Sequence, residues 1–194
     1  INSNFGTVLH TGDFKIDKDP ILDKPIDYKK LGHALGGRPS LCVVDSTNML
    51  NENKGKSESL LKESIYKIIN QSKGRIIFTS FASNLGRLKI IADAGEKSGR
   101  SIAVFGRAMN NMLSKAIETG ILTHFPNLID PRKAHLVPKE NLLVIATGSQ
   151  GEIRAASAQL SRGKYMGLEI GDGDTFVFSS KTIPGNEIAV NRVI

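Results

Sequence analysis

Four short apolar runs, rich in β-branched residues, constrain this chain most, because each ends in a polar turn and helical patterns separate them. The runs are residues 75–80, 101–106, 142–147 and 175–180. Continuous apolar runs of this length are typical of strands covered on both faces of a sheet. Apolar side chains recur at helical spacing in residues 61–69, 85–95, 109–116, 152–162 and 187–194. The alternation predicts an α/β fold with a doubly wound, mainly parallel sheet.

The carboxyl ends of parallel strands meet at one edge of a sheet, and ligands of such folds bind there. The turns that follow the four runs contain small hydrogen-bonding groups and cations. We call this set the rim: Ser80, Ser83, Asn84, Arg87, Arg107, Gly148, Ser149, Gln150 and Ser179. A guanidinium such as that of Arg107 can form a forked contact with phosphate, whereas Arg87 can equally be a solvated surface group. The rim is predicted to bind phosphate.

Residues 147–152, Thr-Gly-Ser-Gln-Gly-Glu, join an apolar run to a helical pattern. Glycines permit positive φ, turn amides can converge, and a helix N-terminus adds partial positive charge, so this turn favours an anion. A Rossmann-like module that binds a nucleotide or sugar phosphate remains an alternative. Against it, no Gly-x-Gly-x-x-Gly opens the first strand–helix unit.

The first 48 residues have a different pattern. Residues 6–10 and 41–44 suit strands, a charged loop joins them, and only residues 28–35 suit a helix. We expect residues 1–50 to be the edge of a neighbouring domain, residues 51–56 to be the crossing, and residues 51–194 to be the α/β domain.

The balance of charge favours a polyanionic partner. Lys and Arg number 26 against 19 Asp and Glu, a formal net charge of +7. The charges are scattered, which also fits an ordinary basic surface. The single cysteine, Cys42, lies in an apolar run and is predicted to be a buried, inert thiol in a reducing compartment. No stretch approaches the roughly 20 apolar residues of a membrane span, so no membrane partner is expected.

Three motifs occur in the order Thr-Gly-Asp-Phe-Lys (11–15), Thr-Gly-Ser-Gln-Gly-Glu (147–152) and Ile-Pro-Gly-Asn-Glu (183–187). In this order they resemble the ribonuclease J family, nucleases with a metallo-β-lactamase fold and a β-CASP domain. The resemblance implies a β-CASP domain preceded by a piece of the metallo-β-lactamase αββα domain. It also implies RNA as the partner, two zinc ions, endonuclease and 5′→3′ exonuclease activity, a cytoplasmic location and a possible homo-oligomer.

Two aspartates stand directly after strand-like runs. By chemistry alone, Asp13 and Asp45 are most often turn or cap residues. The resemblance implies that Asp13 bridges the two metal ions, and that Asp45 orients a histidine near them and assists proton transfer. Two neighbouring ions suit phosphodiester hydrolysis, since both charges stabilise the attacked phosphoryl group.

The histidines do not complete a metal centre. The family needs a His-x-His-x-Asp-His cluster, whereas His10, His33, His124 and His135 have no ligand-like spacing. The chain also begins with Ile1, and we therefore expect an internal piece, truncated at its C-terminal end and catalytically inactive alone. Another metallo-β-lactamase-fold hydrolase, acting on a small ester or thioester, is a further alternative, although such enzymes lack the inserted α/β domain.

Overall fold

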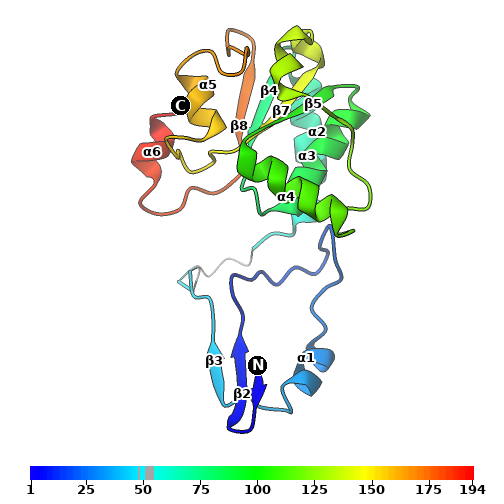
Figure 1. Ribbon diagram of the computed structural model, residues 1–194, viewed down its shortest axis with the longest axis vertical. Helices are drawn as coiled ribbons and strands as arrows, with labels where there is room; N and C mark the ends of the chain where they lie inside the picture. The colour runs from blue at the N-terminus through cyan, green and yellow to red at the C-terminus, as the bar shows by residue number, and fades with distance from the viewer. Residues whose placement is uncertain (48, 51–54) are drawn as a thin grey trace. The chain divides into compact units, whose positions relative to one another are not determined.

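The computed structural model describes residues 1–47, 49–50 and 55–194, which form two compact units, Ile1–Leu60 and Leu61–Ile194 (Figure 1). The expected domain boundary after residue 50, and the crossing at 51–56 apart from Gly55 and Lys56, involve residues outside this described part. No helix among the described residues is both long and apolar enough to cross a membrane.

A five-stranded sheet forms the centre of the larger unit, in the spatial order β6-β5-β7-β4-β8. Its strands are β4 (Ile76–Thr79), β5 (Ser101–Phe105), β6 (Leu128–Ile129), β7 (Leu142–Ala146) and β8 (Thr175–Phe178). All their pairings are parallel. The predicted doubly wound α/β fold is therefore confirmed, and four of the strands lie within the four apolar runs.

Helices cover both faces of this sheet. The helices of this unit are α2 (Leu61–Gln71), α3 (Leu85–Lys97), α4 (Arg107–Glu118), α5 (Ala156–Ser161) and α6 (Glu187–Asn191), with short 3-10 helices η2 (Pro131–Leu136) and η3 (Lys139–Asn141). Helix α3 lies on one face, where a Cβ on its Gly95 would come 3.3 Å from the Leu143 side chain of β7. Because neighbouring residues of a strand point to opposite faces, Leu142 and Val144 lie on the other face, where α5 packs.

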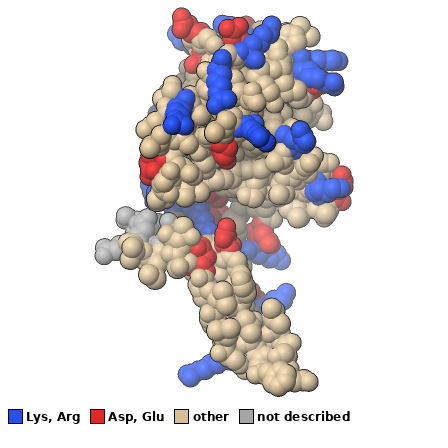
Figure 2. Space-filling model, turned by 60° about the vertical axis from the view of Figure 1, so that its left-hand side comes forward, with Lys and Arg blue, Asp and Glu red and all other residues tan. Residues whose placement is uncertain are grey.

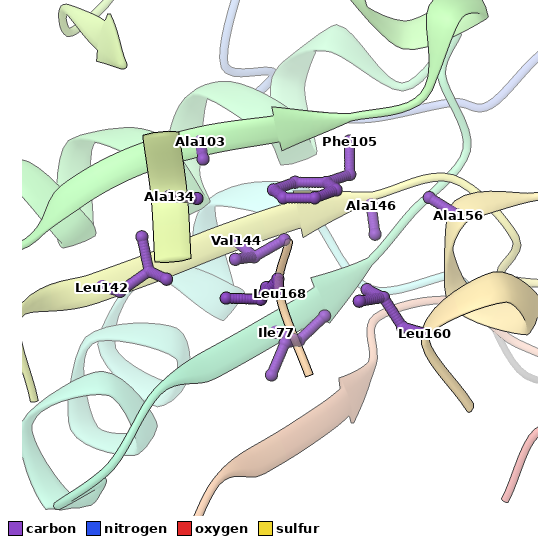
Figure 3. Packing of buried hydrophobic residues seen from close by; sticks show 10 residues of the cluster. All are labelled: Ile77, Ala103, Phe105, Ala134, Leu142, Val144, Ala146, Ala156, Leu160 and Leu168. Atoms are coloured by element: carbon purple, nitrogen blue, oxygen red, sulfur yellow. The ribbon is translucent and has the colours of Figure 1, made fainter. Parts of the chain in front are cut away.

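On the face of the sheet where α5 packs, a hydrophobic core joins the strands to α5 and to η2. Figure 3 shows Leu160 of α5 and Ala134 of η2 over the central strands, with Ile77 of β4 and Val144 of β7 beneath them. The side chains of this cluster are almost completely buried, and each large one contributes about 1.5–3 kcal/mol relative to exposure. The layers thus hold the carboxyl ends of the strands in fixed positions.

One predicted helix starts later than expected. Residues 152–162 were expected to be helical, but α5 begins only at Ala156. Gly151 has a φ of 73°, and the Glu152 carboxylate accepts a hydrogen bond from the Gln150 amide at 3.0 Å. This local bond holds the chain in a turn, and the first helical turn of the prediction is wrong. The predicted terminal helix at 187–194 is also shorter in the structure, because it ends at Asn191.

The smaller unit has a three-stranded sheet in the order β1-β2-β3, formed by β1 (Asn2–Ser3), β2 (Gly6–His10) and β3 (Leu41–Val43). It also contains α1 (Tyr28–Ala34) and the 3-10 helix η1 (Glu58–Leu60). Strands β2 and β3 are parallel. None of its described residues is buried, and Cys42 is exposed. The prediction of a buried thiol is wrong, because no described layer of this unit covers β3.

Candidate functional site

The carboxyl ends of four strands converge at one edge of the larger sheet. Thr79 of β4 pairs with both Ala146 of β7 and Phe178 of β8, and Phe105 of β5 pairs with Ala146. The residues that follow, among them Ser80 and Ser179, therefore lie side by side along this edge. The prediction that the carboxyl ends of these four strands share one edge of the sheet is confirmed.

Strands β4 and β7 are neighbours whose following helices lie on opposite faces of the sheet. Helix α3, which follows β4, packs on one face, and α5, which follows β7, packs on the other. This is the topological switch point of an open α/β sheet, where a crevice for a ligand forms at the carboxyl ends. The rim residues Ser80 and Ser149 follow these two strands.

Ser80 and Ser149 have buried hydroxyls without a protein partner. Both residues are 2% exposed, and neither Oγ has a hydrogen bond within the described chain. Buried polar groups in proteins are nearly always paired, so two such hydroxyls near a switch point are unusual. Because both oxygens are covered, a phosphate can reach them only if the surrounding turns move.

Asn84 and Arg87 form internal contacts. The Asn84 side-chain oxygen accepts a hydrogen bond from the Arg87 amide at 3.0 Å and so caps α3. The Arg87 guanidinium donates to the Ser179 carbonyl and, at 2.9 Å, to the Ser179 hydroxyl. These residues connect α3 to the end of β8, whereas their neighbour Ser83 is exposed.

Gly148 and Gln150 shape the turn after β7. Gly148 has a φ of 109°, and a Cβ there would come 1.9 Å from the Ser157 hydroxyl. The buried Gln150 side chain bonds with residues 180–186, and its backbone amide is already bonded to Glu152. Since this amide is used internally, it is not a free donor for an anion of the kind that a nucleotide-binding loop offers.

Arg107 is the most accessible cation of the rim. It is exposed, starts α4, and its side chain makes no hydrogen bond or ion pair with other described residues. The preceding Gly106 has a φ of 130° and supplies no side-chain cap, so the first amides of α4 are not capped by a side chain. Two exposed cations were not among the predicted site residues: Arg154 in the turn after β7 and Lys181 after β8. The sequence contained one signal for these two residues, because each follows the carboxyl end of a predicted strand.

The loops that carry Asp13 and Asp45 lie together in the smaller unit. They follow the parallel strands β2 and β3, where His10 pairs with Val43. The Thr11 hydroxyl accepts a hydrogen bond from the Asp45 amide at 3.1 Å, and the Thr11 amide donates to the Val43 carbonyl. The two aspartates are thus presented at one edge of the small sheet.

Hydrogen bonds stabilise the charged form of Asp45. The Thr47 amide and hydroxyl donate to its carboxylate at 2.9 and 2.7 Å, and the Phe14 backbone adds a further hydrogen bond. These donors lower the pKa of Asp45 below its ordinary value. Asp13 is exposed.

The described residues do not form a zinc centre by themselves. No group of three or more His, Cys, Asp or Glu side chains with metal-binding geometry occurs in residues 1–47, 49–50 and 55–194. His10 accepts a hydrogen bond from the Gly12 amide at 3.1 Å, which holds its Nδ1 within the turn. Asp13 can supply one carboxylate, but a zinc site needs three or four protein ligands from His, Cys, Asp or Glu.

Sequence comparisons identify relatives of this chain. Residues 73–194 match the family model "Ribonuclease J, beta-CASP domain". The whole chain is 39% identical to ribonuclease J of Sinorhizobium meliloti, 42% identical to ribonuclease J 1 of Streptococcus pyogenes and 36% identical to ribonuclease J of Thermus thermophilus. It covers 34%, 35% and 34% of these proteins respectively, so it spans about a third of their length.

Proposed function

Because this chain belongs to the ribonuclease J family through its β-CASP domain, we propose that it is part of a ribonuclease that hydrolyses phosphodiester bonds of RNA. The observation that carries the proposal is the edge of the larger sheet, where four strand ends, an uncapped helix start and the exposed Arg107 come together. Such an edge suits a phosphate backbone more than a flat surface does.

The distribution of charge supports binding of RNA by the larger unit. Residues 61–194 contain 18 Lys and Arg against 11 Asp and Glu, whereas residues 1–60 contain 8 of each. Figure 2 shows many Lys and Arg side chains on one face of the molecule, with Asp and Glu side chains between them. Because the chain has no Trp and only 6% aromatic residues, recognition of the backbone rather than stacking of bases is expected.

Within the rim we propose a division of work. Arg107, Ser83 and the first amides of α4 contact phosphates directly, since they are accessible. The side chains of Asn84, Arg87 and Gln150 hold the turns in place, because their hydrogen bonds are internal. Ser80, Gly148 and Ser149 line the switch point and Ser179 lies at the neighbouring end of β8, and the two buried hydroxyls of Ser80 and Ser149 become donors to RNA when the turns shift.

In this proposal, the smaller unit supplies two carboxylates that take part in hydrolysis. Asp13 would provide one carboxylate to a centre of two zinc ions, and the described residues do not gather a group of three or more ligands for such a centre. Zinc supplies a hydroxide that is active at neutral pH. The hydrogen bonds that lower the pKa of Asp45 favour its charged form, and this carboxylate could accept a hydrogen bond from an imidazole N–H and so orient it.

The finer features follow from the family resemblance. We propose that the enzyme acts both as an endonuclease and as a 5′→3′ exonuclease in RNA processing and decay, that it works in the cytoplasm, and that it forms a homo-oligomer. The 194-residue chain by itself is expected to bind RNA weakly and to leave it intact, since its described residues do not gather a set of metal ligands.

Cleavage and binding assays test the proposal. The complete protein that carries this chain should cleave 5′-monophosphorylated RNA in the presence of zinc, and the 194-residue chain should not. Arg107→Ala should weaken RNA binding by about two- to fivefold. Arg162→Ala is the matched control, because Arg162 is also exposed but follows the far end of α5. Equal effects of the two variants, or robust cleavage by the chain alone, would contradict the proposal.

A further inference from the structure

We propose that Lys181 is an additional contact for the RNA backbone and that Gln150 is the residue that positions it. The inference rests on the proposed function, because it names further members of the same binding edge. It also changes the predicted role of Gln150 from a ligand of RNA to a support. The geometry of the segment after β8 points to both assignments.

The side-chain amide of Gln150 is fully used inside the protein. Its Nε2 donates to the Lys181 carbonyl at 3.0 Å and to the Ser180 hydroxyl at 3.4 Å. Its Oε1 accepts from the Ile183 amide at 2.8 Å and from the Asn186 side chain at 3.3 Å. A side-chain amide has two donor hydrogens and two acceptor sites, so no capacity remains for a ligand.

The orientation of this amide is determined by its two backbone partners. The Lys181 carbonyl can only accept, and the Ile183 amide can only donate. Exchanging the nitrogen and oxygen of Gln150 would place donor against donor and acceptor against acceptor. Gln150 is also 6% exposed, so water does not replace these contacts easily. It therefore fixes the backbone on both sides of residue 182.

Lys181 has a fixed backbone and a free side chain. Its carbonyl is held by Gln150, while its ammonium is exposed and makes no hydrogen bond or ion pair within the described chain. The two acids near this segment, Glu152 and Glu187, each accept a hydrogen bond from a backbone amide, those of Gln150 and Gly185. A lysine held in this way loses less freedom on binding phosphate than one on a loose loop.

The position of Lys181 extends the accessible part of the rim. Strand β8 is separated from β5 by β4 and β7, so three gaps of about 4.8 Å place the two strand ends roughly 14 Å apart. Arg107 follows β5 and Lys181 follows β8. A single RNA strand that crosses this edge can therefore contact a cation at each end of its path.

Binding of a short fluorescein-labelled oligouridylate to the complete protein, in the presence of a chelator, tests the inference. Lys181→Ala should weaken binding about two- to fivefold. It should also lower the slope of log K against log salt by about 0.7, the loss expected for one phosphate contact on a single strand. Lys73→Ala is the control, because this exposed lysine precedes β4 at the opposite edge of the sheet.

Gln150→Leu tests the positioning role. It should weaken binding about as much as Lys181→Ala, and the double variant should show little additional loss, because both changes remove the same contact. Additive losses would overturn the role of Gln150. An unchanged affinity and salt slope for Lys181→Ala would overturn the contact itself, whatever the stability of the Gln150 variant.

The outcomes also separate this inference from the proposed function. If RNA binding responds to Arg107→Ala and not to Lys181→Ala, only the inference fails. If the unaltered protein does not bind the oligouridylate, the proposed function fails with it.

Discussion

The two units use the same kind of strand with opposite results. Leu41–Val43 in the smaller unit and Leu142–Ala146 in the larger one are both short, apolar, parallel strands. All five residues of the second are buried, whereas all three of the first are exposed. The larger sheet has helices on both faces, and the described part of the smaller one has no covering layer. An apolar run therefore predicts a strand, but its burial depends on what packs against the strand.

Charge divides the units as well. The whole excess of basic residues belongs to residues 61–194, while residues 1–60 are balanced and hold both candidate catalytic aspartates. We infer that binding and chemistry belong to different parts of the chain, and the following predictions test that division and the contrast in packing.

The largest effect is expected for Asp13. Asp13→Ala in the complete protein should reduce RNA cleavage to background, because it removes the carboxylate that we propose binds the metal ions. RNA affinity measured with a chelator present, and the urea midpoint of the larger unit, should be unchanged. Asp19→Ala, an exposed acid of the same unit, serves as the control and should retain cleavage. Retained cleavage by Asp13→Ala would place the chemistry elsewhere.

The next largest effect is expected on stability, when Arg100 of the larger unit is replaced. Arg100 is 9% exposed, and its guanidinium donates to the carbonyls of Gly74 at 2.8 Å and Leu142 at 3.2 Å, and also to those of Ile69 and Ser72. Arg100→Met removes the donors to these four carbonyls and should lower the free energy of unfolding by about 3–5 kcal/mol in urea titrations. Arg38→Met, in the smaller unit, should have little effect.

A pair of leucine substitutions compares the sheets directly. Leu142 begins β7 and is fully buried, while Leu41 begins β3 and is 54% exposed. Leu142→Ala should cost about 2–5 kcal/mol of unfolding free energy, because it leaves a cavity. Leu41→Ala should stay within about 0.5 kcal/mol. Similar losses at both positions would show that β3 is covered in solution.

The reactivity of the Cys42 thiol also tests whether β3 is covered. As the single cysteine, and an exposed one, it should react with a thiol reagent in the folded 194-residue chain at a rate close to that in denaturant. Labelling that begins only when urea is added would mean that a layer covers β3.

The smallest effect concerns the charge of Asp45. Because its pKa lies below the ordinary 3.8, this contact stabilises the fold above that pH and is lost as the pH falls through the lowered value. Thr47→Val removes the hydroxyl donor and should raise the pKa of Asp45 in an NMR titration. Asp130 is the internal control: Arg132 lowers the pKa of this carboxylate in the larger unit, and the substitution should leave it unchanged.

The sequence did not predict β6, which has only two residues. It predicted the other four strands of the larger unit, since each apolar run is long enough to need cover on both faces. It also predicted that their ends share an edge. It did not predict that Glu152 bonds to the Gln150 amide and delays α5, because that depends on the positive φ of Gly151. The internal partners of Arg87 and Gln150 lie 92 and 31 residues away in sequence, so their hydrogen bonds could not be predicted from local pattern.

The place of β7 in the sheet has a consequence for biosynthesis. Strand β4 pairs only with β7 and β8, both of which follow it by more than sixty residues, and β5 meets β4 only through β7. While the ribosome makes residues 76–141, β4 has no partner strand and its edges remain available to wrong ones. Sheet closure therefore waits for the synthesis of residues 142–146, and such non-local pairing is slow. This interval is where we expect a chaperone to matter most to the nascent chain.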